Sequence, residues 1–91
     1  MLQKEYVIVN KLGLHARASA LLVKTSSRFN SEVKLAREDV EVNGKSIMGI
    51  MMLEAGIGSK ITMVANGDDA EAATKELETL LVSENIDDLV I

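Results

Sequence analysis

Residues 32–44 read EVKLAREDVEVNG, and this segment carries the main information about the fold class. Apolar and polar residues alternate on both sides of a short polar turn at residues 37–39, a pattern that predicts a β-hairpin. Val33 and Leu35 are expected to face inward, and Val40 and Val42 resume the alternation after the turn. Asn43-Gly44 is expected to end the second strand. A hairpin is an antiparallel unit, so the sheet that contains it is expected to be mostly antiparallel.

The segments around the hairpin predict two more strands and three helices. Alternating residues predict strands over 2–9 and 60–65, and periods of three to four residues predict helices over 16–28 and from about 70 to about 84. The apolar stripes of these helices are Ala18, Leu21, Leu22, Thr25 and Phe29 in the first, and Ala70, Ala73, Leu77, Leu80 and Leu81 in the last. Ser46 is expected to cap a short helix over 47–53, and Asp68 or Asp69 to cap the last helix.

The predicted order, β-α-β-β-α-β-α, indicates an α+β protein with its helices stacked on one face of the sheet. Ninety-one residues fit a single small domain. We expect residues 1–85 to form this domain and residues 86–91 to form a C-terminal tail. The apolar side chains of the tail either pack on the domain or belong to a disordered end.

Composition excludes several kinds of chemistry. The chain has no cysteine, no proline and one histidine, so disulfides, zinc–thiolate sites and cysteine nucleophiles are ruled out. Its net charge of −4 argues against nucleic-acid binding as a main function. No apolar run approaches the ~20 residues that span a bilayer, and residues 1–5 do not look like a signal peptide. We therefore expect a cytoplasmic protein without membrane insertion.

The single histidine, His15, stands just before the first predicted helix. At that position the ring lies beside unpaired backbone N–H groups and the positive end of the helix dipole, which both favour an anion. Arg17 adds a planar charged fork that suits phosphate oxygens, and Ser19 is near enough to add a hydroxyl. A neutral imidazole is also a nucleophile.

One hypothesis is therefore that His15 accepts a phosphoryl group. The competing interpretation is an ordinary surface or helix-capping histidine. A metal site is disfavoured, because the chain has no second histidine or cysteine and no acidic residue within four positions of His15.

A second cluster follows the hairpin. Six of the seven residues from Ile47 to Leu53 are large and apolar. A short helix can turn Ile50 and Leu53 toward the sheet, which leaves Ile47, Met48, Met51 and Met52 near the surface. An exposed apolar patch usually marks an interaction site, and methionine adapts to differently shaped partners. The alternatives are a wholly buried turn, or a patch covered by the C-terminal tail.

Gly44-Lys45-Ser46 looks like the end of a nucleotide-binding loop, but Asp39 occupies the place of the first glycine, so that motif is rejected.

Together, GLHAR at residues 13–17 and KSIMGIM at residues 45–51 resemble the histidine-containing phosphocarrier (HPr) family of the bacterial phosphoenolpyruvate-dependent phosphotransferase system. The order and spacing of the elements are similar to that family from residue 1 to about residue 84. The resemblance implies an open-faced β-sandwich, in which three helices cover one face of four antiparallel strands. It implies no cofactor.

The resemblance also implies a function. His15 would take a phosphoryl group on Nδ1 from the phosphohistidine of enzyme I and pass it to a histidine of an enzyme IIA domain for sugar uptake, with Arg17 holding the phosphate. Such a protein is a carrier, not an enzyme with its own turnover, and we expect a monomer. The expected partner surface comprises Ala16, Ala20, Lys24, Ile47, Met48 and Met51.

Ser46 corresponds to the serine that a dedicated kinase, HPr kinase/phosphorylase, modifies in many bacteria. That modification would weaken the encounter with enzyme I and can create a partner for a transcriptional regulator. A phosphate would add about −1.5 to −2 charge beside Ile47 and Met48, which opposes an apolar interface.

One position departs from the family pattern. Proline usually follows the arginine, and this chain has Ala18. Proline pre-sets φ in a first helical turn, whereas alanine is the best helix former, so we expect a looser turn rather than lost function. Two alternatives remain: a regulatory carrier of the nitrogen-related branch, and an interaction module that has lost carrier activity. Ser46 followed by Ile47 and Met48 favours the sugar branch.

Overall fold

Four strands form one antiparallel sheet, which makes up one layer of the molecule. The structure is a computed structural model, and it describes residues 1–84. The strands are β1 (Leu2–Val7), β2 (Glu32–Arg37), β3 (Val40–Asn43) and β4 (Lys60–Asn66). Their order across the sheet is β1-β4-β2-β3. β2 and β3 form the predicted hairpin, and β4 pairs antiparallel with both β1 and β2.

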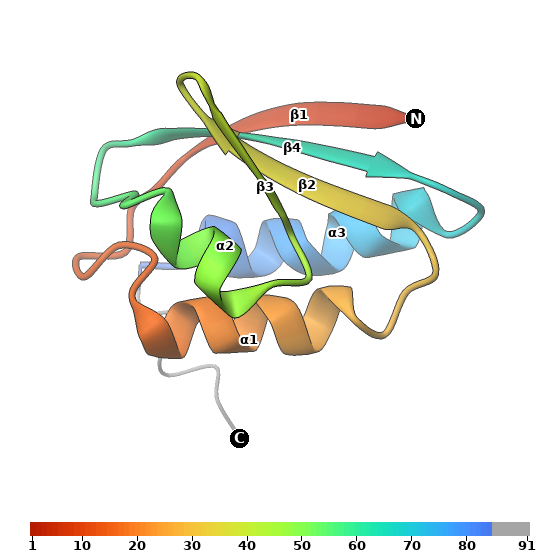
Figure 1. The fold of residues 1–91 in the computed structure, drawn as a ribbon, viewed down its shortest axis with the longest axis horizontal. Coiled ribbons are helices and arrows are strands. Elements are labelled where there is room, and N and C mark those ends of the chain that lie inside the picture. Colours follow the sequence, from red (N-terminus) through yellow and green to blue (C-terminus); the bar gives the residue numbers. More distant parts are fainter. Residues whose placement is uncertain (85–91) are drawn as a thin grey trace.

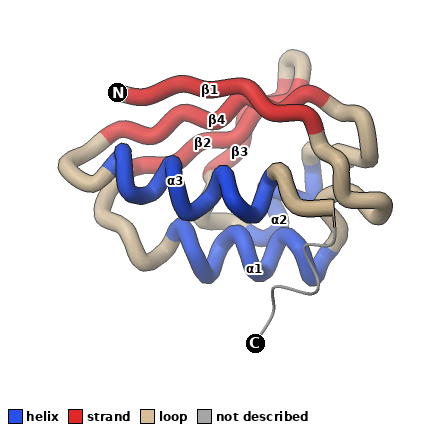
Figure 2. Tube along the Cα trace, turned by 180° about the vertical axis from the view of Figure 1, so that it is seen from behind, coloured by secondary structure: helices blue, strands red, loops and turns tan. Residues whose placement is uncertain are grey.

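Three helices form the second layer: α1 (Ala16–Ser26), α2 (Ile47–Met52) and α3 (Ala70–Leu81). Figures 1 and 2 show all three on the same side of the sheet, with no described element across its other face. The predicted class, an α+β open-faced sandwich with the order β-α-β-β-α-β-α, is confirmed. The expected tail at 86–91, and the expected end of the domain at residue 85, lie outside the described residues.

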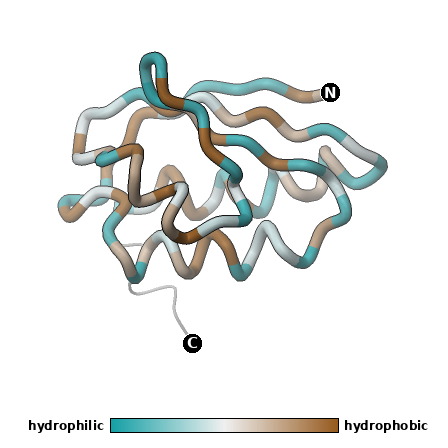
Figure 3. Tube along the Cα trace, in the orientation of Figure 1, coloured by the Kyte–Doolittle hydropathy of each residue, from teal (hydrophilic) through white to brown (hydrophobic). Residues whose placement is uncertain are grey.

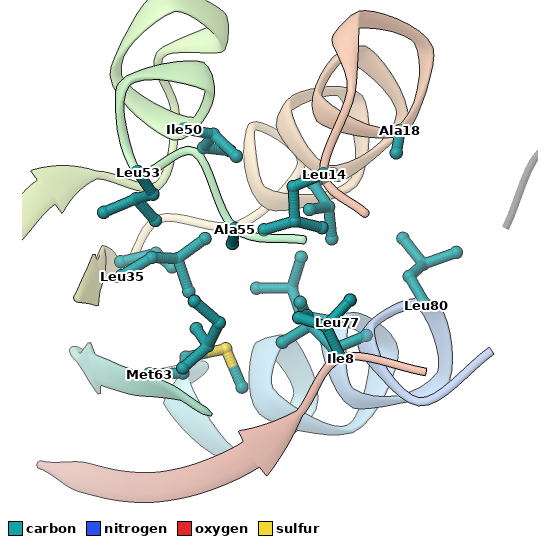
Figure 4. Packing of buried hydrophobic residues seen from close by; sticks show 14 residues of the cluster. Ile8, Leu14, Ala18, Leu35, Ile50, Leu53, Ala55, Met63, Leu77 and Leu80 are labelled. Carbon is teal, nitrogen blue, oxygen red and sulfur yellow. The ribbon is translucent and has the colours of Figure 1, made fainter. Parts of the chain in front are cut away.

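The strand register places the apolar side chains between the two layers. Leu35 lies opposite Met63, and Val33 lies opposite Ala65, so these side chains share the helix-facing side of the sheet. Figure 4 shows Leu35 and Met63 packed in one cluster with Ile50 of α2 and Leu77 of α3, and all of them are buried. In Figure 3 hydrophilic residues occupy the tip of the β2–β3 hairpin, which projects away from this core.

Several expected boundaries differ from those in the structure, and β4 runs one residue further than expected, to Asn66. β1 ends at Val7 rather than residue 9, because the N–H and C=O of Ile8 bond Ser59 and Gly58 of a loop instead of continuing the ladder. α1 ends at Ser26 rather than Arg28, since the N–H groups of Arg28 and Phe29 bond carbonyls only three residues back. α3 ends at Leu81 rather than about residue 84, with Val82 in the C-cap position.

The end of α1 is tied to the segment that enters α2. The hydroxyl of Ser26 donates to the carbonyl of Gly44 at 2.7 Å, and Nζ of Lys45 donates to the carbonyl of Phe29 at 2.7 Å. A side chain at Gly44 would collide with Val33, so glycine at this position permits the backbone to approach β2 closely. These contacts place α2 beside α1 (Figure 1) and therefore bring the two motifs of the sequence onto neighbouring helices.

Candidate functional site

His15 occupies the N-cap position of α1, as the sequence predicts. Its backbone is extended, with φ −73° and ψ −179°, and its carbonyl accepts the first helical hydrogen bond, from the N–H of Ser19 at 2.8 Å. The N–H groups of Ala16, Arg17 and Ala18 precede that bond, and the first turn of α1 holds no acidic side chain. The end of the helix beside the ring therefore offers donors and a positive dipole to an anion.

The loop before His15 is held by a network of hydrogen bonds. Gly13 has a φ of +66°, and a side chain there would collide with the carbonyl oxygen of Ala55. That same oxygen accepts from the N–H of Leu14 at 2.8 Å. The side chain of Asn10 donates to the carbonyl of Gly13 at 2.9 Å. Figure 4 shows Leu14 and Ala55 in the buried cluster, so the backbone on the N-terminal side of His15 is anchored to the core.

The ring of His15 is half-buried, and its Nε2 atom is buried. Arg17 is exposed, and no hydrogen bond or ion pair engages its guanidinium within residues 1–84. An anion beside His15 would therefore lie near a guanidinium, two residues along the chain, that no group of the described residues engages.

The expectation for Ser19 is wrong. Its side chain is fully buried, and its hydroxyl donates to the carbonyl of Leu14 at 3.1 Å. The cause is the helical period: the fourth residue of α1 lies on the core side, with Ala18 and Leu22. Ser19 thus supports the turn before the helix and does not face solvent with Arg17.

The apolar residues of α2 divide as predicted. Ile50 and Leu53 are buried, whereas Met48 is 76% exposed and Met52 is 68% exposed. Ile47 and Met51 are also exposed. The wholly buried turn is therefore excluded; cover by the C-terminal tail concerns residues outside the described part of the chain. On α1, the expected partner residues Ala16, Ala20 and Lys24 are exposed as well.

Ser46 caps α2, as predicted. Its Oγ accepts a hydrogen bond from the N–H of Gly49 at 3.0 Å, and the residue is half-buried. The cap places the hydroxyl next to Ile47, at the start of the exposed apolar segment. Substituents on this oxygen would stand beside that segment.

Leu12 is an exposed apolar residue that the sequence patterns do not identify. It is 70% exposed and lies in the loop that precedes His15. The only signal for it is an isolated leucine in a polar loop, which is too weak to predict exposure.

Within residues 1–84, no group of three or more His, Cys, Asp or Glu side chains is arranged to hold a metal ion. In the same part of the chain, none of the helices combines the length and the apolar character that crossing a bilayer requires.

The structure is thus an open-faced α+β sandwich that presents the chain's single histidine at the start of a helix, with an arginine two residues on. The family model described as the PTS HPr component phosphorylation site matches residues 2–83. This chain is 49% identical to the phosphocarrier protein HPr of Cupriavidus necator, over 91% of this chain and 93% of that protein.

Two solved structures agree with this match. The crystal structure of HPr-C-His from Thermoanaerobacter tengcongensis superposes with a TM-score of 0.85 at 44% identity, over 89% of this chain and 91% of that one. An HPr dimer from the same organism gives a TM-score of 0.69 at 45% identity, over 88% of this chain and 92% of that one. The chain therefore belongs to the HPr family of the phosphotransferase system, whose members are phosphocarriers rather than enzymes.

Proposed function

We propose that His15 is the phosphoryl-carrying residue. It accepts the group from the phosphohistidine of enzyme I and passes it to a histidine of an enzyme IIA domain in sugar uptake. The observation that carries the proposal is the position of His15 at the N-cap of α1, beside three first-turn N–H groups and two residues before the exposed Arg17. Family membership supports the same role.

The chemistry follows from this geometry. A lone pair of the neutral His15 ring attacks phosphorus, a new N–P bond forms, and the N–P bond to the donor histidine breaks with its electron pair. Burial of Nε2 disfavours attack by that atom, which supports transfer at Nδ1. The first-turn N–H groups and the guanidinium of Arg17 then stabilise the negative oxygens. Transfer to enzyme IIA is the same exchange with His15 as the leaving group.

The partner surface in this proposal spans α1 and α2. It consists of Ala16, Ala20, Lys24, Ile47, Met48 and Met51. All six residues are exposed, and the two helices pack together, which supports one continuous surface for both partners. Small side chains on α1 allow close approach, and the methionines of α2 adapt to two differently shaped partners.

We propose that phosphorylation of Ser46 by an HPr kinase/phosphorylase regulates this surface. A phosphate on the capping Oγ would stand beside Ile47 and Met48 and would make an apolar interface with enzyme I unfavourable. The modified face would then suit a transcriptional regulator with a basic patch.

The remaining features of the proposal concern the whole chain. Residues 1–85 form the carrier domain, residues 86–91 form a tail, and the protein works as a cytoplasmic monomer that binds no nucleic acid. Light scattering on the purified chain is expected to give the monomer mass of 9.8 kDa; a stable dimer would contradict this part. Sugar-branch enzyme I is expected to phosphorylate the chain faster than nitrogen-branch enzyme I.

The main test is phosphorylation with enzyme I and phosphoenolpyruvate. Intact-mass spectrometry is expected to find one added phosphoryl group that acid removes. His15→Ala is expected to abolish it, whereas Lys24→Ala, on the same helix, slows the reaction without preventing it. An unmodified mass for the parent chain would refute the carrier role. That result would instead favour the alternative, an interaction module without carrier activity.

A further inference from the structure

A cavity of about 620 Å³ lies at the end of the sheet where the β2–β3 hairpin turns, and no residue of α1 or α2 lines it. Its volume is in the range of small-molecule sites. Glu5 of β1 and Thr62 of β4 line it and lie opposite each other in the strand register. The neighbours of Thr62 along β4, Ile61 and Met63, are buried in the core. Glu5 and Thr62 therefore point to the other face of the sheet, which no described helix covers (Figures 1 and 2).

Four charged side chains line the cavity, and their charges balance. Glu5 and Glu38 are acidic, and Arg37 and Lys60 are basic. Nη1 of Arg37 donates to the carbonyl of Leu53 at 3.2 Å, which uses one of the five N–H groups of the guanidinium. A ligand with a net charge gains no net attraction from a balanced cavity. A zwitterion can instead place each of its charges beside side chains of the opposite sign.

Glu38 holds a backbone conformation that glutamate rarely adopts. Its φ of +55° lies in the left-handed region, which glycine enters freely and which asparagine and aspartate tolerate better than other side chains do. Residues held in this region cost stability, and they cluster at functional sites. Glycine at position 38 would relieve the strain but would bring no carboxylate to the cavity. The glutamate therefore indicates a use for its side chain beyond the turn itself.

The opposite wall of the cavity is a loop that is fixed to β1 and presents an apolar side chain. The N–H of Gly58 donates to the carbonyl of Ile8 at 2.7 Å, and the N–H of Ile8 donates to the carbonyl of Ser59 at 2.9 Å. Ile57 precedes this anchored pair, lines the cavity and is 61% exposed. An aliphatic group in the cavity would cover part of that apolar surface.

We propose that this cavity is a binding site for a small aliphatic zwitterion, a free α-amino acid such as leucine. The carboxylate binds Arg37 and Lys60, the ammonium group binds Glu5 and Glu38, and the aliphatic chain lies against Ile57. Glu5, Glu38 and Lys60 are exposed, so their contributions are screened by solvent and the dissociation constant is expected to be on the order of 1–10 mM. The site does not rest on the carrier role of His15, because the two use different elements.

A titration of the ¹⁵N-labelled chain with L-leucine, followed by two-dimensional NMR, tests the site. Saturable shifts are expected for the backbone amides of residues 58–62 and for those of the hairpin turn. Acetate supplies only the carboxylate and n-butylammonium supplies only the cation. Each is expected to bind at least about threefold more weakly than leucine, since each loses one set of charge contacts. Equal binding of either ion would overturn the assignment of a zwitterion.

Glu38→Gly separates the role of the carboxylate from that of the turn. Glycine suits the positive φ, so this variant is expected to unfold at a higher temperature than the parent. It is also expected to bind leucine about two- to fivefold more weakly, because one carboxylate is lost. Glu32→Gln is the matched control, since it removes the same charge at the other end of β2, outside the cavity, and is expected to keep the parent affinity.

The outcomes of these measurements are independent of the phosphorylation test. A leucine titration without saturable shifts, or a Glu38→Gly variant that binds leucine as the parent does, would overturn the inference and leave the carrier role intact. An equal loss of affinity in Glu32→Gln would also overturn it, because net charge rather than the cavity would then govern binding. Glu38→Gly is expected to be phosphorylated by enzyme I at the parent rate.

Discussion

The carboxylate of Asp69 fixes a loop instead of capping its own helix. Asp69 stands at the N-cap position of α3 but makes no side-chain cap. One of its oxygens accepts from the N–H of Asn30 at 2.8 Å, and the other accepts from the N–H of Ser31 at 2.9 Å and from the Ser31 hydroxyl. The hydrogen bond from the Ser31 side chain, followed by that from the Asn30 backbone, lowers the pKa of this carboxyl. The ionised form is therefore favoured in the folded state.

This pKa shift predicts a pH dependence of stability. The pKa of Asp69 in the folded chain lies below the ordinary value of 3.8. The contribution of the Asp69 carboxylate to stability is therefore fully present above pH 3.8 and is lost as pH falls through the folded pKa. Asp69→Asn is expected to lower the thermal unfolding temperature at neutral pH, and the difference from the parent is expected to shrink in acid. Calorimetry over a pH series measures it. A difference that stays constant across the acid range would contradict this account.

Tyr6 makes a second contact between segments that are distant in the sequence, β1 and α3. Its hydroxyl donates to Oε2 of Glu78 on α3 at 3.2 Å, and Lys4 lies 3.6 Å from the same oxygen. Burial, and then the hydrogen bond to Glu78, raises the pKa of Tyr6 to about 12. The neutral phenol is favoured in the folded state. The surroundings of Tyr6 therefore stabilise the fold at pH values below 10, and this contribution disappears as pH rises toward about 12.

A spectroscopic titration tests this pKa directly, because the chain has one tyrosine and no tryptophan. The ultraviolet absorbance change of phenolate formation is expected near pH 12. Glu78→Gln is expected to move it part of the way toward 10, since burial remains. Circular dichroism on the same samples confirms that the chain is still folded. A titration near 10 in the folded parent chain would contradict the contact.

At the scale of the elements, hydrophobic periodicity was enough to predict the order of strands and helices. It also predicted which face of α2 is buried, because a helix of this length can turn only Ile50 and Leu53 to the sheet together. Three of the errors share one cause. Ser19, Asp69 and Ile8 each bond a group that is remote or on an irregular loop, and no local pattern encodes such a partner.

The hydrogen bond that caps α2 is expected to contribute to the stability of the protein. Ser46→Ala removes the hydrogen bond to the N–H of Gly49 and is expected to reduce the free energy of unfolding by about 0.5–2 kcal/mol. Ser46→Asp keeps a capping oxygen and is expected to stay near the parent value. Urea unfolding measures both variants. An unfolding free energy of Ser46→Ala equal to that of the parent would show that the cap does not contribute.

At the scale of the whole molecule, methionines have two separate roles, one in the buried core and one on the exposed face of α2. Met63 is buried in the core between the layers, whereas Met48 is largely exposed on α2. Met63→Ala is expected to cost about 2–5 kcal/mol of stability because it leaves a cavity. Met48→Ala is expected to change stability by less than about 0.5 kcal/mol.

Phosphorylation rates distinguish the same pair of variants. Met48→Ala is expected to slow phosphorylation by enzyme I through a weaker encounter, a loss that a higher concentration of the carrier restores. Denaturant unfolding and initial rates of phosphorylation together test whether Met63 acts in stability and Met48 in the encounter with enzyme I. A destabilised but fully active Met48→Ala variant would reverse the assignment.

The most direct test of the central claim follows the phosphoryl group through this chain. The phosphorylated protein is isolated from enzyme I and mixed with an enzyme IIA domain. The account predicts that the phosphoryl group leaves His15 and appears on a histidine of enzyme IIA, while the carrier returns to its unmodified mass. A phosphoryl group that stays on this chain, or that is lost only to water, would contradict its role as a carrier.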